Sequence, residues 1–410
     1  MVRILHSADW HLGHTLMGWS REAEHGRALA ALVEIAVSRA VDAVIVAGDV
    51  FDGQNPSARA EQLLYRTLID LRRRLPDAVL IVTAGNHDPA GRLEAPHALL
   101  VELGVHVIGT VARVGEAIDL DRHLIAVPAR DGGASIHVLA LPHLGPAALP
   151  PLDRRSDEPG SPVVRAVRAF HADAIAAARA RIGAAPLVVT GHLAIAGASE
   201  SEGAERRILI GGEHAIPTDL FPADLAYVAL GHLHRAQTLA NGRIRYAGSL
   251  FPLSATERPY DHGVTVATIA DGATELEHVA IPRPARFLRV PATGALPLAE
   301  IEAALVGLGL DPDAPLDLRP FVQLAVRLDG PTPSLKADLD RLAAAHPIRF
   351  VGHTVERAGA AVETPVPEAP LLDLAEHDPA DIFARAFTEA HGYAPEPAHT
   401  HVFDLVRAEE

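Results

Sequence analysis

Five short apolar runs along the chain each end directly in a cluster of polar residues. The runs cover residues 2–6, 43–47, 79–84, 187–190 and 226–230, and they are rich in Val, Ile, Leu and Ala. Short apolar runs of this composition predict strands that are buried on both faces. The polar clusters that follow them are Asp9-Trp10-His11, Gly48-Asp49, Gly85-Asn86-His87-Asp88, Gly191-His192 and Gly231-His232-Leu233-His234.

Helical periodicity fills the segments between these runs. Apolar residues at helical spacing predict helices over about 21–40, about 57–74 and about 163–182. The alternation of strands and helices is typical of a layered α/β domain, which we place at residues 1–282. Residues 146–163 are rich in Pro with mixed charges, and we expect an exposed loop there.

The pattern changes near residue 283. Strands are predicted over 286–290, 321–328 and 348–352, and helices over about 297–307 and about 334–345 lie between them. We therefore expect a small α+β domain at residues 283–358, which carries none of the five polar clusters.

A linker and a helical tail are predicted to follow the small domain. The linker covers residues 359–377, and its first part is rich in Pro, Ala and Glu. Residues 378–410 form the tail, in which residues 378–390 are predicted to be an amphipathic helix with Asp378 as N-cap and Pro379 at its first position. An apolar helix behind a linker either packs on its own domain or binds a partner.

The residue types in the five clusters indicate metal binding. In an open α/β sheet, residues just past the carboxyl ends of the strands converge on one crevice. Oxygen and imidazole donors without thiolates suit divalent ions such as Mn²⁺ or Fe²⁺. Seven donors are too many for one closed tetrahedral zinc site but suit two ions that share a carboxylate. The predicted ligands of this dinuclear site are Asp9, His11, Asp49, Asn86, His192, His232 and His234.

Spacing suggests how the ligands divide between two ions. Asp9 and His11 are two residues apart, so both side chains can point the same way as the chain leaves the sheet. Asp49 follows a glycine, which lets the turn approach closely, and its carboxylate can bridge both ions. We allocate Asp9, His11, Asp49 and His234 to one ion, and Asp49, Asn86, His192 and His232 to the other. Ions about 3.5–4 Å apart clamp a phosphate and activate a water for in-line attack.

Three further residues near these ligands have predicted roles. His87 follows a ligand and can protonate the leaving alkoxide as a general acid, and Asp88 can orient its imidazole. Arg92 can contact a substrate phosphate, although a solvated arginine is the favoured interpretation. Trp10 is predicted to be a packing residue.

Composition is ordinary for a globular protein, with 49% hydrophobic and 21% charged residues. Cysteine is absent, which excludes disulfides and thiolate metal sites and fits a reducing cytoplasm. The first residues run directly into a predicted strand without a signal peptide, and no apolar stretch approaches the ~18–20 residues needed to cross a bilayer. We therefore expect a cytoplasmic protein that does not contact membranes.

Negative charge is concentrated near the C-terminus. The net charge is −16, and residues 361–410 alone contain eleven Asp or Glu and two Arg. Two divalent ions would also add about four positive charges at the crevice. The charge therefore excludes a broadly basic, purely electrostatic binder of nucleic acid, but it does not exclude a polyanionic substrate.

The motifs resemble those of the calcineurin-like metallophosphoesterase superfamily. Four strings are similar, more narrowly, to the bacterial SbcD nuclease subunit family: residues 4–13, 48–52, 85–89 and 246–254. The resemblance implies a β-sandwich flanked by helices, with metal ligands at the positions allocated above and Mn²⁺ as the usual ion. It also places the family's catalytic histidine at His87.

The same resemblance implies a larger assembly. It implies ATP-stimulated cleavage of DNA at double-strand ends and hairpins, in complex with an SbcC-type ATPase subunit and with a homodimer of nuclease subunits. The small domain is similar to the family's capping domain, and residues 378–390 resemble the segment that docks on the ATPase. Residues 148–161 look like a loop particular to this lineage.

Two other functions use the same residues. A small-molecule metallophosphodiesterase or phosphatase could have this metal core, but it would not need the added domain and tail. A non-catalytic scaffold for an ATPase would be free to lose its ligands, whereas all seven are present here. We therefore favour a two-metal DNA nuclease that acts as one subunit of an ATP-dependent complex.

Overall fold

The computed structural model describes residues 1–130, 132–152, 161–199, 216–328, 332 and 334–357, together with residues 380, 383–384, 387–388, 394–396 and 399–400. It divides into two compact units, Met1–Glu356 and Arg357–Glu410, which are described separately. In these parts of the chain, we find no helix with the length and apolar character that crossing a membrane requires.

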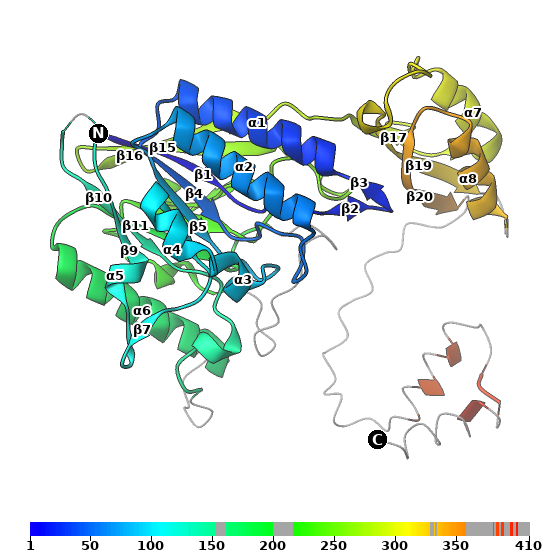
Figure 1. Ribbon diagram of the computed structural model, residues 1–410. Helices are drawn as coiled ribbons and strands as arrows, with labels where there is room; N and C mark the ends of the chain where they lie inside the picture. The colour runs from blue at the N-terminus through cyan, green and yellow to red at the C-terminus, as the bar shows by residue number, and fades with distance from the viewer. Residues whose placement is uncertain are drawn as a thin grey trace. The chain divides into compact units, whose positions relative to one another are not determined.

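Two six-stranded sheets form the body of the first unit (Figure 1). The first sheet has the order β16-β15-β1-β4-β5-β6, in which β1, β4, β5 and β6 are parallel. Its strands are β1 (Val2–Ser7), β4 (Ala43–Ala47), β5 (Val79–Thr83), β6 (Val105–Ile108), β15 (Gly263–Ala270) and β16 (Ala273–Ala280).

The second sheet has the order β13-β14-β12-β11-β10-β9, with a parallel centre and an antiparallel strand at each edge. Its strands are β9 (Leu124–Val127), β10 (Ile136–Ala140), β11 (Leu187–His192), β12 (Tyr227–Gly231), β13 (Gln237–Leu239) and β14 (Ile244–Tyr246). The five motif strands predicted from the sequence are β1, β4, β5, β11 and β12.

The two sheets pack face to face, and helices cover their outer faces. Ile45 of β4 shares one buried cluster with Val188 of β11 and Tyr227 of β12, so this cluster lies between the sheets. The next residue of β4, Val46, belongs to a different cluster, which helices α1 (Glu22–Ser38) and α2 (Ala58–Arg74) cover. This two-sided burial explains why the motif strands are continuously apolar.

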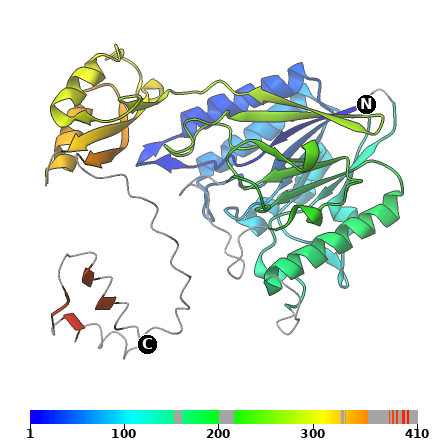
Figure 2. The same cartoon turned by 180° about the vertical axis from the view of Figure 1, so that it is seen from behind.

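Helix α6 (Pro162–Ile182) covers the second sheet, as the view from behind in Figure 2 shows. The resulting β-sandwich flanked by helices confirms the expected fold. One expectation was wrong in detail, because the motif strands do not belong to one open sheet. They divide between two sheets whose carboxyl ends lie at the same end of the sandwich.

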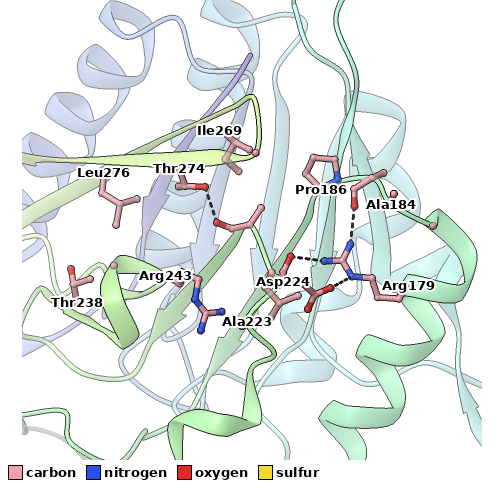
Figure 3. Close-up of a pocket in the computed structure, with 16 residues that line it drawn as sticks. Arg179, Ala184, Pro186, Ala223, Asp224, Thr238, Arg243, Ile269, Thr274 and Leu276 are labelled. Carbon is pink, nitrogen blue, oxygen red and sulfur yellow. Dashed lines mark hydrogen bonds and ion pairs between the residues drawn. The ribbon is translucent and has the colours of Figure 1, made fainter.

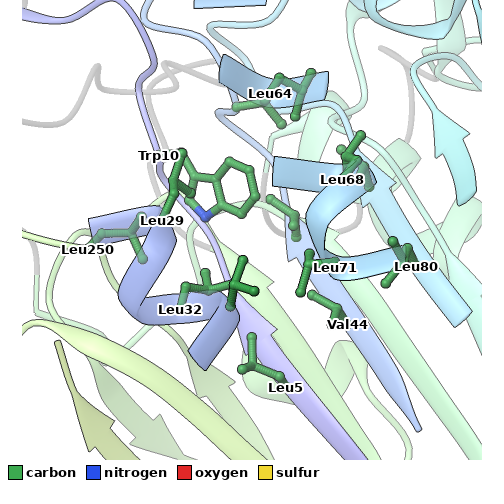
Figure 4. Packing of buried hydrophobic residues seen from close by; sticks show 14 of the residues in the cluster. Leu5, Trp10, Leu29, Leu32, Val44, Leu64, Leu68, Leu71, Leu80 and Leu250 are labelled. Carbon is green, nitrogen blue, oxygen red and sulfur yellow. The ribbon is translucent and has the colours of Figure 1, made fainter. Parts of the chain in front are cut away.

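Trp10 anchors the cluster beneath α1 and α2 (Figure 4). Its side chain is fully buried among leucines that include Leu29 and Leu64, and its indole N–H donates to Ser7 Oγ at 2.8 Å. The predicted packing role of Trp10 is therefore confirmed. Its burial also fixes the backbone between Asp9 and His11.

Local capping explains where the helices begin and end. Ser57 caps α2 by accepting a hydrogen bond from the Ala60 backbone N–H, and three arginines in the last turn complement the helix dipole. Ser161 caps α6 in the same way, and Pro162 occupies its first position. The predicted boundaries of these helices agree with the structure within two residues.

The small domain has a four-stranded sheet with two helices and its own core. Its elements are β17 (Phe287–Val290), β18 (Leu296–Pro297), α7 (Leu298–Val306), β19 (Phe321–Leu328), α8 (Leu335–Ala344) and β20 (Arg349–Arg357). All three predicted strands and both predicted helices are present, and the short strand β18 is an addition.

Short elements complete the unit. They are β2 (Thr15–Leu16), β3 (Trp19–Ser20), α3 (Ala90–Glu94), α4 (His97–Leu100), β7 (Arg113–Val114), β8 (Ala117–Ile118), α5 (Leu120–His123) and the 3₁₀ turns η1 (Val101–Leu103), η2 (Pro146–Ala148), η3 (Thr218–Leu220), η4 (Ala240–Gly242) and η5 (Leu316–Leu318). Most of the predicted 148–161 loop and of the 359–377 linker lies outside the described residues. Within the predicted 378–390 helix, residues 380, 383–384 and 387–388 are helical, and the Phe383 and Phe387 rings lie 5.7 Å apart.

Candidate metal centre

The predicted ligands meet at one end of the sandwich. Asp9 and His11 follow β1, Asp49 follows β4, and Asn86 lies in the loop after β5. From the second sheet, His192 ends β11, whereas His232 and His234 follow β12. The site is therefore built where the carboxyl ends of both sheets come together.

Two overlapping groups of ligand atoms define the site. Asp9, His11 and His234 form one group, and Asp9, Asp49 and His192 form the other, with all ligand atoms of a group within 4.8 Å of one another. Asn86 Oδ1 joins the second group, 3.0 Å from His192 Nε2 and 3.2 Å from His232 Nδ1. The structure thus brings all seven predicted ligands together.

Two carboxylates, rather than one, lie between the groups. Asp49 Oδ2 lies 3.6 Å from His11 Nε2 and 3.3 Å from His192 Nε2, which suits the predicted bridging position. Asp9 belongs to both groups, although its spacing from His11 had predicted a place in only one. Its Oδ1 is fixed by the His232 backbone N–H at 2.9 Å.

Unmatched polar atoms test whether a cation fits here. Asp9 Oδ2 and His11 Nε2 are buried and have no hydrogen-bond partner among the described residues. Such orphaned atoms are costly unless an ion or a proton satisfies them. A divalent cation accounts for both atoms, because carboxylate oxygen and imidazole nitrogen are suitable donors.

His192 gives a second indication of a cation. Its Nδ1–H donates to the Ala47 carbonyl at 2.9 Å, so the Nε2 lone pair of the neutral ring faces the oxygens of Asp49 and Asn86. Three lone pairs that face each other require a positive charge between them. In the metal-free protein a proton supplies this charge: burial lowers the pKa of His192, but the Asp49 carboxylate outweighs burial and raises it to about 9.

The backbone at the ligands is strained. Asp9, His11, Asp49 and His232 have φ values of 52°, 47°, 49° and 96°, in the left-handed region that residues other than glycine rarely adopt. The extended backbone expected at Asp9 and His11 is therefore wrong. A turn held by Trp10 aims both side chains, and strain of this kind is concentrated at functional sites.

Two glycines allow the ligand loops to approach. A Cβ added at Gly48 would lie 2.2 Å from His192 Nδ1, and one at Gly85 would lie 2.2 Å from Asp49 Oδ1. No side chain fits at either position without moving a ligand. The expected close approach at the glycine before Asp49 is therefore present in the structure.

His87 lies beside the ligands, and its contacts differ from the expectation. Its ring packs edge-on against His11, with centroids 4.8 Å apart, and its Nδ1–H donates to the Asp52 backbone carbonyl at 2.9 Å. The Asp88 carboxylate instead accepts hydrogen bonds from the backbone N–H groups of Val50, Phe51 and Gly85. Asp88 therefore joins two loops, and the Asp52 carbonyl orients the imidazole.

Arg92 does not point into the ligand cluster. It lies on α3, is half exposed, and its Nε lies 2.9 Å from Glu61 Oε1 of α2. This ion pair agrees with the favoured interpretation of a surface arginine.

Two carboxylates of the site were not predicted. Asp52 Oδ1 accepts from His11 Nδ1 at 3.2 Å, and Glu257 Oε1 accepts from His234 Nδ1 at 2.9 Å. Asp52 closes the Gly48–Asp52 string, so a sequence signal for it was present. Glu257 follows His234 by 23 residues and belongs to no strand or helix, so only the tertiary structure reveals it.

A separate cavity at the other end of the sandwich has different chemistry (Figure 3). Its volume is about 860 Å³, and Pro186 and Ala226, which precede β11 and β12, contribute to its lining. Its described lining contains no histidine and a single carboxylate, Asp224, which is paired with Arg179 at 2.9 Å. The cavity therefore lacks a donor set for metal.

Comparison with known proteins gives two family matches. The calcineurin-like phosphoesterase family matches residues 2–236. The family described as type 5 capsule protein repressor C-terminal domain matches residues 283–391. The first match contains all seven predicted ligands, and the second begins where the predicted small domain begins.

Curated relatives match over both parts of the chain. The D component of nuclease SbcCD from Rhodobacter capsulatus is 52% identical over 389 residues, which cover 94% of each chain. The proteins of the same name from Bacillus subtilis strain 168 and Escherichia coli K12 are 37% and 36% identical, covering 66% and 68% of this chain and 67% and 68% of theirs. The chain therefore belongs to the calcineurin-like phosphoesterase family and, within it, to the group of SbcD nuclease subunits.

Proposed function

We propose that this chain is a two-metal DNA nuclease and the nuclease subunit of an SbcCD-type complex. The observation that carries the proposal is the convergence of seven metal donors from two sheets, in a chain 52% identical to a nuclease subunit over nearly its whole length. The substrate is duplex DNA, at double-strand ends and hairpins.

Two divalent ions, most simply Mn²⁺, occupy the centre. Asp9, His11 and His234 hold one ion, Asn86, His192 and His232 hold the other, and Asp49 lies between them. When bound, such ions polarise a phosphodiester and lower the pKa of a water for in-line attack. Oxygen and imidazole donors without sulfur support Mn²⁺ over softer ions.

His87 acts on the leaving group. Because its Nδ1–H donates to the Asp52 carbonyl, its Nε2 is the atom that can hold and deliver the proton. Its backbone N–H donates to Asp49 Oδ1 at 2.9 Å, which ties the general acid to the bridging carboxylate. Protonation of the leaving alkoxide at Nε2 is the role that this geometry supports.

The partners are an SbcC-type ATPase subunit and a second copy of this chain. Names of the relatives support the first partner, since all three are subunits of a complex called SbcCD. The ATPase would dock on residues 378–390, where the Phe383 and Phe387 rings share one helical face. The small domain would act as a cap beside the metal centre.

Hydrolysis of labelled linear duplex DNA and of bis-p-nitrophenyl phosphate with Mn²⁺ tests the proposal. We would compare the wild type, His87→Ala and the control His353→Ala, an exposed histidine on β20. We expect His87→Ala to lower turnover by ~10²–10⁴-fold with Mn²⁺ still bound, and His353→Ala to change nothing.

Two outcomes would contradict it. Near wild-type turnover by His87→Ala would remove the general-acid role. Hydrolysis of the small ester without DNA cleavage, both alone and with an SbcC-type ATPase and ATP, would instead indicate a small-molecule phosphodiesterase.

A further inference from the structure

Carboxylates support the imidazoles on one side of the metal centre. His11 donates its Nδ1–H to Asp52, and His234 donates its Nδ1–H to Glu257. Both histidines belong to the group that also contains Asp9. Each ring therefore turns its Nε2 toward this group, while a negative charge lies behind it.

Glu257 is built into the fold for this contact. Its side chain is fully buried, and its Oε2 accepts the Leu253 backbone N–H at 2.9 Å. Its Oε1 accepts the Ser254 hydroxyl at 3.2 Å in addition to the His234 ring. Among the described residues, the ion-pair partner of this buried carboxylate is a histidine and not an arginine or lysine.

The other side of the centre has neutral supports. His192 donates its Nδ1–H to the Ala47 carbonyl, and His232 Nδ1 lies 3.2 Å from the Asn86 amide oxygen. Within the part of the chain that is described, no carboxylate outside the ligand set contacts either ring. The two positions thus differ in the charge behind their imidazoles.

We propose that the two ion positions have unequal affinities, and that Asp52 and Glu257 are the positioning residues that make the first one tighter. A carboxylate behind a metal-binding imidazole fixes its tautomer and raises its basicity, and loss of such a partner costs about 10–100-fold in metal affinity. The inference rests on the proposed two-metal site. It follows that the position served by Asn86, His192 and His232 loses its ion first, and that nuclease activity depends on filling it.

Equilibrium dialysis of the full chain against Mn²⁺ tests the inference without measuring activity. The wild type should bind two ions in two affinity classes. Glu257→Gln and Asp52→Asn should each weaken the tighter class by about 10–100-fold and leave the weaker class unchanged. Asn86→Ala should remove the weaker class, which identifies its position.

Asp42→Asn serves as the matched control. Asp42 is a buried carboxylate at the opposite end of β4, where it accepts the Arg3 backbone N–H and pairs with Arg130. It should leave both classes unchanged. If Glu257→Gln fails to fold, Asp52→Asn still decides the question, because the Asp52 side chain is 39% exposed and the fold does not depend on it.

Equal affinity of the two ions in the wild type, or weakening of the looser class by Glu257→Gln, would overturn the inference. A chain that binds two Mn²⁺ ions unequally but cuts no DNA would leave the inference intact and contradict the nuclease proposal instead. A chain that binds no Mn²⁺ would contradict the metal site itself.

Discussion

Histidines of this protein differ in charge because their surroundings differ. His171 on α6 is buried against Phe170 and Phe221, and burial lowers its pKa to about 4. His192 is equally buried, yet the Asp49 carboxylate raises its pKa to about 9. The residue type alone does not distinguish a core histidine from a site histidine, whereas the presence of a facing carboxylate does.

The lowered pKa of His171 predicts a loss of stability in acid. The unfolded chain protonates this histidine below its ordinary pKa of 6.5, whereas the folded chain keeps it neutral down to about pH 4. Stability is therefore full above pH 6.5 and falls as the pH decreases, by about 2 kcal/mol at pH 5. His171→Phe should remove this part of the acid sensitivity, as measured by urea unfolding at pH 7.5 and pH 5. His353→Ala should not, and an unchanged pH dependence in His171→Phe would contradict the assignment.

Two loops, rather than any single helix or strand, hold the ligands in register. Asp88, in the loop after β5, accepts the backbone N–H groups of Val50 and Phe51 in the loop after β4. The same carboxylate accepts the Gly85 N–H of its own loop at 2.7 Å. It therefore sets the distance between Asp49 and Asn86, which the loops carry.

Removal of this clamp should weaken both the fold and the metal site. Asp88→Ala leaves three buried N–H groups without acceptors, at about 1–3 kcal/mol each. We expect the free energy of unfolding to fall by at least about 3 kcal/mol, and the affinity for Mn²⁺ to fall with it. Chemical unfolding and equilibrium dialysis measure these quantities, with the exposed Asp70→Ala on α2 as control. Wild-type affinity for Mn²⁺ in Asp88→Ala would show that the clamp does not position the ligands.

A buried charge cluster joins the small domain to the body of the first unit. Glu24 of α1 accepts two hydrogen bonds from Arg21, at 2.8 and 2.9 Å, and lies 3.5 Å from Arg349 of β20. The guanidinium groups of both arginines also stack on the Phe321 ring of β19. Since all three charged side chains are buried, they are matched only when the domains are in contact.

Neutralising Glu24 should therefore loosen the domain contact. Glu24→Gln leaves two buried guanidinium groups poorly matched, and breaking a buried pair costs about 3–5 kcal/mol. We expect a loss of that size in chemical unfolding, together with faster hydrogen exchange in residues 283–356. Glu22→Gln, in an exposed pair with Arg59, should cost less than about 1 kcal/mol. Equal effects of the two changes would show that the cluster does not hold the domains together.

The sequence by itself determined the strands, the helices and the identity of the ligands. Those features depend on local order: an apolar run predicts a buried strand, and the polar residues that follow Ala47 or Thr83 must lie at its carboxyl end. It did not determine that β4 and β11 belong to different sheets, because sheet membership depends on contacts between distant segments. Only the tertiary structure placed Glu257 behind His234, Asp9 between both ligand groups and Asp88 on the backbone of a neighbouring loop. These contacts join segments up to about 220 residues apart, as Asp9 and His232 show, and no pattern within one segment encodes them.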